Sequence, residues 1–154
     1  MINTKVTLAG VELKNPVMTA SGTFGSGAEY SEFVDLNKLG GVVTKGVANV
    51  PWPGNPTPRV TETASGMLNA IGLQNPGIDT LIARDLPYLY EHGAHIIVNV
   101  CGRSKEDYVE VVERLADEDV DMLEINISCP NVKAGGIAFG QKPEMAEEIT
   151  KAVK

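Results

Sequence analysis

A cysteine just beyond an apolar run is the residue of this sequence best suited to chemistry. Cys129 follows the run that ends at Ile127 and stands between Ser128 and Pro130. A lone cysteine is more often a small buried hydrophobic residue. A thiol on a loop after a strand, among hydrogen-bonding residues, is instead placed to act as a base or a nucleophile. Cys129 is therefore the first candidate for a catalytic residue.

The other cysteine, Cys101, has no evident acid or base partner beside it, and we predict that it is a structural thiol. The two cysteines do not make a disulfide framework, and in a reducing compartment both should be free. Neither belongs to a CxxC pair or a Cys/His cluster. A zinc site is therefore not expected.

Four apolar runs of the sequence end in a polar residue. In parallel α/β proteins, ligands bind at the carboxyl ends of the strands, so these residues would surround one opening. Exposure to water explains any one of them well, but four together favour a binding site. The four residues are Ser21, Lys45, Asn99 and Asn126.

A carboxylate is expected on the same face as this set. Glu124 and Asn126 are two residues apart, so they share one face of a strand. If Lys45 and Asn126 point inward, Glu124 does so too, and an inward carboxylate needs a partner. A lysine on a strand outside this chain would serve. The alternative is a different register, in which Glu124 meets solvent.

Strands that alternate with helices must position these residues. Apolar runs predict four parallel strands, over residues 16–21, 42–45, 95–100 and 121–127, after a small hairpin over 6–17. Helical spacing and caps predict four helices, over 30–37 and 78–89, from the cap Ser104 to Leu115, and from Pro143 onward. A proline-rich loop over 51–58 leads to a short extra strand over 59–63, and residues 67–77 are predicted to be irregular.

The alternation predicts an α/β fold, for which a doubly wound sheet and a (β/α)₈ barrel are both suitable. No G-x-G-x-x-G follows the first strand, so a dinucleotide-binding fold loses its main support. The chain has 154 residues, whereas a full barrel needs about 250. We therefore predict one domain over residues 1–154 that is half of a TIM barrel, with about four parallel strands and the helices outside.

The charge of the chain excludes some partners. Thirteen basic and 20 acidic residues give a net charge of −7, which argues against binding to nucleic acid or an anionic membrane. No apolar stretch is long enough to cross a bilayer, and the N-terminus lacks the apolar core of a signal peptide. We expect a cytoplasmic protein.

Several motifs, in order along the chain, together resemble class 1 dihydroorotate dehydrogenases. The loop Asn55–Arg59 and the stretch Gly66–Asn69 resemble subclass 1B. Class 2 enzymes carry serine as the base, so Cys129 places the resemblance in class 1. The resemblance covers the whole chain. The motifs that carry it are Leu8–Val17, Thr44–Gly46, Asn69–Gly77 and Asn126–Asn131.

The resemblance implies a role for each matching residue. Cys129 matches the catalytic base. The positions that match FMN-binding residues are Ser21, Lys45, Gly46, Asn99 and Asn126. The positions that match substrate-binding residues are Lys45, Asn69, Ala70, Ile71, Gly72, Leu73, Asn126 and Asn131.

The activity implied is the oxidation of dihydroorotate to orotate in pyrimidine (UMP) biosynthesis. The cysteine takes the C5 proton and FMN takes the C6 hydride. Subclass 1B enzymes are homodimers of this subunit with an electron-transfer subunit, a heterotetramer, and the second subunit carries FAD and an iron–sulfur cluster and reduces NAD⁺. This chain has no cysteine cluster for iron–sulfur ligation, so that cluster would belong to the partner.

The chain departs from the family in length, because a complete member is about twice as long. The resemblance implies that this chain is the N-terminal half of such a TIM barrel. The phosphate site expected after strands seven and eight is absent, so this chain alone is predicted to be inactive. Two alternatives stay open. One is another FMN barrel that acts on pyrimidines, such as dihydropyrimidine dehydrogenase, and the other is a half-barrel without activity that serves in assembly.

Overall fold

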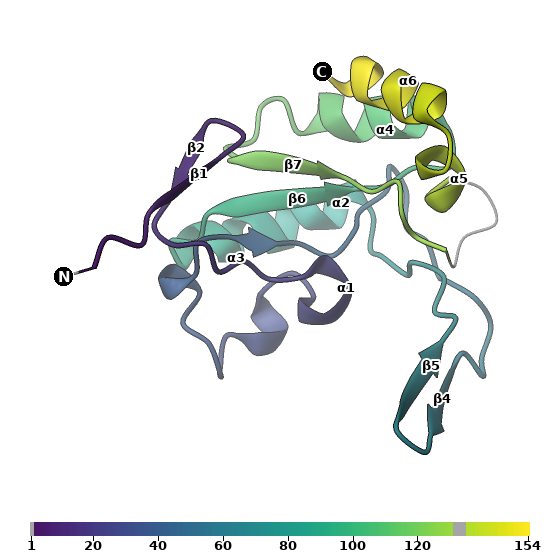
Figure 1. Cartoon of the computed structure of the whole chain (residues 1–154), viewed down its shortest axis with the longest axis horizontal. Helices are drawn as coiled ribbons and strands as arrows, with labels where there is room; N and C mark the ends of the chain where they lie inside the picture. Colours follow the sequence, from purple (N-terminus) through teal and green to yellow (C-terminus); the bar gives the residue numbers. More distant parts are fainter. Residues whose placement is uncertain (1, 131–134) are drawn as a thin grey trace.

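A three-stranded parallel sheet forms the centre of the protein (Figure 1). The computed structural model describes residues 2–130 and 135–154. The strands are β3 (Val42–Val43), β6 (Ile96–Val100) and β7 (Met122–Ile125), in the order β3-β6-β7. An isolated parallel bridge joins Met18 to Gly41, so the chain segment around Met18 lies next to the start of β3. The predicted parallel sheet is confirmed.

The helices cover one face of this sheet. Alternate strand residues such as Val42, Ile96 and Val98 join the helical side chains in one buried apolar core. Burial of these side chains is the main stabilising contribution to the fold. The helices that contribute are α2 (Ile78–Thr80), α3 (Leu86–Glu91), α4 (Lys105–Arg114) and α6 (Pro143–Val153).

Local sequence signals explain where α4 and α6 begin and why the helix between Ile78 and Glu91 is irregular. Ser104 accepts a hydrogen bond from the Asp107 N–H, and the Asp107 carboxylate bonds back, so the predicted capping box is confirmed. Pro143 is the first residue of α6, as predicted. A π-helical segment, Leu81–Asp85, separates α2 from α3. Pro87 lacks an N–H, so regular helical bonding cannot continue through this point.

The other face of the sheet is less covered. Ile97 pairs with Met122 and Asn99 with Glu124, which places these residues on the face away from the helices. The antiparallel hairpin of β1 (Val6–Leu8) and β2 (Val11–Leu13) lies at one end, as predicted. A hollow of about 470 Å³ remains there. Its lining includes Leu8, Met18, Val43, Ile97, Met122 and Glu124.

Two predicted elements are wrong or only partly formed. The predicted strand over 16–21 is reduced to the Met18–Gly41 bridge, and Ser21 begins the short helix α1 (Ser21–Phe24). The predicted helix over 30–37 does not form, and two 3₁₀ turns, Ala28–Tyr30 and Leu36–Lys38, stand in its place. Phe33, expected on its core face, is 80% exposed.

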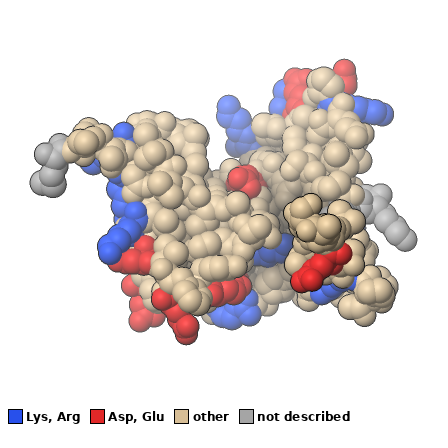
Figure 2. Space-filling model, turned by 60° about the horizontal axis from the view of Figure 1, so that its bottom comes forward, with Lys and Arg blue, Asp and Glu red and all other residues tan. Residues whose placement is uncertain are grey.

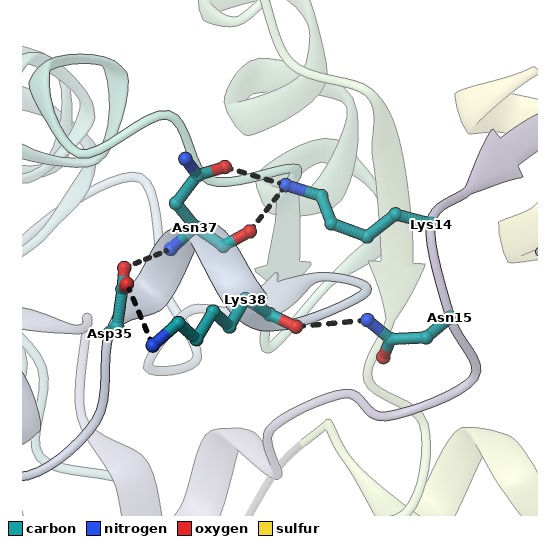
Figure 3. Close-up of polar contacts among 5 residues, drawn as sticks. All are labelled: Lys14, Asn15, Asp35, Asn37 and Lys38. Carbon is teal, nitrogen blue, oxygen red and sulfur yellow. Dashed lines mark hydrogen bonds and ion pairs between the residues drawn. The ribbon is translucent and has the colours of Figure 1, made fainter. Parts of the chain in front are cut away.

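Polar contacts explain why no helix runs through this segment (Figure 3). The Asp35 carboxylate accepts a hydrogen bond from the Asn37 N–H, which favours a turn over a continuing helix. Lys14 Nζ donates to the Asn37 carbonyl at 2.6 Å and to its side chain at 2.7 Å. Asn15 donates to the Lys38 carbonyl at 2.9 Å. These tertiary contacts hold the second 3₁₀ turn against the end of the β1–β2 hairpin.

A second hairpin projects from the body of the protein (Figure 1). It consists of β4 (Val60–Thr63) and β5 (Gly66–Asn69), paired antiparallel, and every residue of both strands is exposed. The predicted strand near residues 59–63 is thus confirmed, but its partner lies within the stretch predicted to be irregular. A short helix, α5 (Ile137–Gly140), was not predicted. Among the described residues, no helix is long and apolar enough to cross a membrane.

Candidate active site

The register of the parallel sheet gathers polar side chains at its carboxyl edge. Thr44 is buried, and its hydroxyl accepts a hydrogen bond from the Asn99 N–H at 3.3 Å. Lys45 and Gly46 therefore follow β3 next to the end of β6. Asn99 faces Glu124 across the β6–β7 pair. Three of the four predicted strand-end residues, Lys45, Asn99 and Asn126, are brought to one region in this way.

The amides of Asn99 and Asn126 form a connected network. Asn126 Nδ2 donates to Asn99 Oδ1 at 3.0 Å, and Asn99 Nδ2 donates to the Glu124 carboxylate. The Ser128 N–H donates to Asn126 Oδ1 at 3.3 Å. Glu124 is on the predicted face, but its partner is Asn99 of this chain, and the residue is also exposed. Asn99 therefore supplies one of the partners of the Glu124 carboxylate, for which a lysine from another strand was expected.

The chain segment that leads to Ser21 runs beside β3. The Thr19 hydroxyl accepts a hydrogen bond from the Val43 N–H at 2.8 Å, so the segment before Ser21 runs beside β3. Ser21 then begins α1 rather than ending a strand.

Gly46 is packed tightly against this network. A methyl group at Gly46 would lie 2.6 Å from Asn99 Oδ1 and 2.7 Å from Cys101 Sγ. Such separations are shorter than carbon makes with these atoms, so a side chain at this position would displace the network. Glycine at this position therefore allows the backbone to pack directly against Asn99 and Cys101.

Cys101 is the buried centre of the site. Its thiol donates to Asn99 Oδ1 at 3.4 Å and is 2% exposed. Burial and, to a lesser degree, the nearby Cys129 raise the pKa of Cys101 to about 12, whereas Lys45 acts in the opposite direction. The thiol is therefore neutral at physiological pH, which suits a packing role better than that of a base.

Cys129 lies on the segment after β7 and is half-buried with a free thiol. Its carbonyl accepts a hydrogen bond from the Ile137 N–H at 3.0 Å, which ties the loop to the start of α5. Gly135 lies against the Gly102 carbonyl with no room for a side chain, so the returning part of the loop lies beside the end of β6. Asn131, the other candidate of this loop, lies outside the described residues.

The stretch Asn69–Leu73 approaches the same region from the β4–β5 hairpin. Asn69 ends β5 and is exposed, whereas Leu73 packs against the buried group of Ala48, Trp52 and Cys101. Leu73 therefore brings this predicted substrate-binding stretch to within contact of the site. Gly72 and Leu73 both have positive φ values, 77° and 55°, which turn the chain sharply here.

Two residues that the sequence analysis did not select hold this stretch in place. Buried Asn75 accepts from the Ala48 and Gly77 N–H groups, both at 3.1 Å, and donates to the Leu73 carbonyl at 2.9 Å. Arg59 donates to the Pro53 and Asn55 carbonyls and to Gln74. The Asn-Pro-Gly sequence that begins at Asn75 is a turn signal and could have identified it. No local signal in the sequence identifies the arginine contacts.

On the face of the molecule shown in Figure 2, the described residues form no continuous basic surface of the kind that binds nucleic acid. Acidic and basic side chains are both present there. Among residues 2–130 and 135–154, no group of His, Cys, Asp and Glu is arranged to hold a metal ion. The chemical groups that the site offers are amides, an ammonium, a carboxylate and thiols.

Comparison with known proteins identifies the family. A sequence profile described as Dihydroorotate dehydrogenase matches residues 3–154. The catalytic subunit of dihydroorotate dehydrogenase B (NAD(+)) from Alkaliphilus metalliredigens is 67% identical over 153 residues, which are 99% of this chain and 51% of that protein. The subunit of the same name from Lachnoclostridium phytofermentans is 66% identical over 153 residues, with the same coverage of 99% and 51%.

A solved structure agrees with this result. The crystal structure of the Eimeria tenella dihydroorotate dehydrogenase in complex with ferulenol aligns with a TM-score of 0.78 at 25% identity, over 98% of this chain and 43% of that one. A parallel sheet with polar groups at the carboxyl ends of its strands is the arrangement by which α/β proteins bind small ligands. This chain belongs to the dihydroorotate dehydrogenase family. It spans about half the length of the curated relatives it matches.

Proposed function

We propose that this chain supplies the catalytic cysteine and part of the flavin and substrate sites of an enzyme that oxidises dihydroorotate to orotate in pyrimidine biosynthesis. The observation that carries the proposal is the convergence of Lys45, Gly46, Asn99 and Asn126 around Cys101, with Cys129 following on the next loop. Family membership supports the same activity.

The site fits FMN, the cofactor of the family. Gly46 is buried, and its lack of a side chain leaves room for the amide of Asn99 and the thiol of Cys101 at this edge of the sheet. Lys45 and Asn126 are both half-buried, so an ammonium and an amide at this edge of the sheet are available to a ligand. The residues that would hold FMN are Ser21, Lys45, Gly46, Asn99 and Asn126. When bound, FMN supplies a hydride acceptor.

The substrate would lie between the Cys129 loop and the stretch Asn69–Leu73. Lys45 would offset the negative charge of the substrate carboxylate, and the amides of Asn69 and Asn126 would bond to the pyrimidine ring. Leu73, held by Asn75, keeps the 69–73 stretch in position. Ala70, Ile71, Gly72 and Asn131 complete the proposed substrate set.

Cys129 would remove the substrate proton as a general base. Its thiol is free and half-buried, whereas the nearby Cys101 is buried and its pKa is raised to about 12. Of the two, Cys129 is the thiol that is accessible to a substrate.

The domain is proposed to be the N-terminal half of a TIM barrel. The helices lie on one face of the sheet, and the opposite face leaves Met18 40% exposed and Glu124 exposed. A second half of similar length would cover this face and supply the remaining strands. Coverage of 51% of the Alkaliphilus relative agrees with this proposal.

The printed name of the relatives, catalytic subunit of an NAD(+) enzyme, supports a partner subunit. In the complete protein we propose a homodimer of this subunit joined by electron-transfer subunits, which would carry FAD and an iron–sulfur cluster. We place the cluster on the partner because the described part of this chain has two free cysteines, whereas such clusters are held by four ligands.

The proposed activity can be tested in a joined protein, meaning residues 1–154 continued by the C-terminal half of the Alkaliphilus metalliredigens relative. Under anaerobic conditions, dihydroorotate is expected to bleach the flavin absorbance of this protein. Dihydrouracil, which lacks the carboxylate that Lys45 would offset, is expected to do so far more slowly. Equal or faster bleaching by dihydrouracil would favour a dihydropyrimidine dehydrogenase instead. A flavin-free joined protein would favour an assembly module.

Replacement of Gly46 by alanine is expected to lower the stability and the flavin content of the joined protein. The added methyl would press on Asn99 Oδ1 and Cys101 Sγ, a form of overpacking that costs about 1–3 kcal/mol. Thermal unfolding and the ratio of flavin to protein absorbance measure the two effects. Gly66→Ala is the matched control, because its methyl would meet only Thr63 Oγ1 at 3.8 Å. Equal behaviour of the two variants would contradict the packing argument.

Replacement of Cys101 by alanine is expected to change stability more than turnover. Loss of the buried sulfur should cost about 1 kcal/mol, the scale of one buried methylene group. Because folding raises the pKa of Cys101 from 9.0 to about 12, the unfolded thiol ionises first as the pH rises. Wild-type stability from this group is thus complete below pH 9 and declines between pH 9 and 12.

Cys101→Ala should lack this alkaline decline. Denaturant unfolding of both proteins across this pH range measures the difference. A selective loss of turnover at unchanged stability would show instead that Cys101 takes part in the reaction.

A further inference from the structure

We infer that Glu124 is a positioning residue, whose carboxylate sets the orientation of the Asn99 and Asn126 amides and thereby of the chain that leads to Cys129. The inference rests on the proposed function, since the residues it positions are those proposed to hold FMN and substrate. None of the contacts it uses involves residues 131–134.

The first step is the orientation of Asn99. An amide can be turned so that either its oxygen or its nitrogen faces a neighbour. An ionised carboxylate only accepts hydrogen bonds. Asn99 and Glu124 lie directly opposite each other on β6 and β7 and are bonded through their side chains. Asn99 must therefore turn Nδ2 toward Glu124, and its Oδ1 faces the other way.

The second step passes this orientation to Asn126. Asn99 Oδ1 accepts from Asn126 Nδ2 at 3.0 Å and from Cys101 Sγ at 3.4 Å. With Nδ2 committed to Asn99, the oxygen of Asn126 is the atom that faces the Ser128 N–H, at 3.3 Å. Reversal of the first amide would place two donors together at the second. The two amides therefore have a single consistent orientation, with each donating toward the previous residue of the series Glu124, Asn99, Asn126, and the carboxylate of Glu124 determines it.

The third step connects the network to the catalytic loop. Ser128 immediately precedes Cys129, and the Asn126 carbonyl accepts from the Tyr108 hydroxyl at 2.7 Å. Asn126 is thus held by both its side chain and its backbone at the point where β7 leads into the loop. Loss of the orienting carboxylate would free both amides to rotate, and misplacement of binding groups by about 1 Å can cost about 100-fold in rate.

The variants Glu124→Met and Glu124→Gln distinguish the role of hydrogen-bond acceptor from the effects of charge and side-chain size. Both side chains are unbranched and close to glutamate in length, but only glutamine keeps an oxygen that can accept from Asn99. In the joined protein we expect Glu124→Gln to stay within about threefold of wild type. We expect Glu124→Met to lower kcat/KM for dihydroorotate by about 10-fold to 100-fold and to shift the absorbance maximum of the bound flavin. Glu113→Met, on the outer helix α4 and exposed, is the matched control.

The outcomes are distinct. A joined wild-type protein without activity would refute the proposed function itself. If the wild-type joined protein is active, equal losses of activity in the Glu124→Gln and Glu124→Met variants would show that the charge of Glu124 matters and not its ability to accept a hydrogen bond. That result would overturn the inference. Unchanged activity in both variants would overturn it too. If Glu124→Met does not fold, Glu124→Ala also lacks the acceptor and cannot overpack. A normal flavin spectrum and turnover in that variant would overturn the inference as well.

Discussion

Replacement of Cys129 by alanine in the joined protein is expected to slow flavin reduction by dihydroorotate about 10²-fold to 10⁴-fold, the usual contribution of a general base. Cys129 is the accessible thiol of the site, on a loop tied at its own carbonyl to Ile137. Its removal deletes one half-buried sulfur and no described hydrogen bond of the network around Asn99. FMN should therefore remain bound, with unchanged absorbance.

Anaerobic stopped-flow measurement of flavin bleaching tests this expectation. Cys101→Ala is the matched control, since it removes the neighbouring thiol from the buried side of the same site. The variant Cys129→Ser is expected to have an intermediate rate of flavin reduction, because a hydroxyl can take the position of the thiol but is a weaker acid. Near-normal reduction of the Cys129→Ala variant at neutral pH would remove this residue from the mechanism.

Residues 1–154 alone are expected to purify without flavin and to form oligomers. Within the described part of the chain, β7 pairs only with β6, which leaves its other edge free to pair with another chain. The face away from the helices exposes Met18 and Glu124. The phosphate of FMN in a TIM barrel is expected near strands seven and eight, so its main anchor would be missing.

Size-exclusion chromatography and the visible spectrum of the purified chain measure both effects. Co-expression with the C-terminal half of the Alkaliphilus metalliredigens relative is the control, and should restore a yellow, discrete complex because the two halves would recreate one core. A monomeric chain that holds one FMN and oxidises dihydroorotate by itself would refute the half-barrel proposal and the proposed place of the phosphate.

Local signals were sufficient for the elements that position the site. The apolar runs at β6 and β7, the capping box of Ser104 and Asp107, and Pro143 all predicted their elements correctly. These features depend on neighbours a few residues apart, so they can be recognised without the fold. Alternation along the strand likewise placed Glu124 on the same face as Asn126, and both side chains bond to Asn99.

Elements whose form depends on distant contacts were predicted poorly. Residues 30–37 have helical spacing, but Lys14 and Asn15 bind the turn at Asn37 and Lys38, and Phe33 remains exposed (Figure 3). The stretch near Met67 reads as irregular by itself and becomes a strand only because Val60–Thr63 pairs with it. In both cases partners far along the chain determine the backbone conformation.

The sequence by itself determined the family, the parallel α/β pattern and the candidate residues, because motifs and apolar periodicity are local properties of the chain. Only the tertiary structure decided how those residues meet. It placed Cys101 in the middle of the site, made Asn99 the partner of Glu124, and brought Leu73 against the same buried group through Asn75. Such contacts join residues 25 positions apart for Asn99 and Glu124, and strand register, which no local signal encodes, is what brings them within hydrogen-bonding distance.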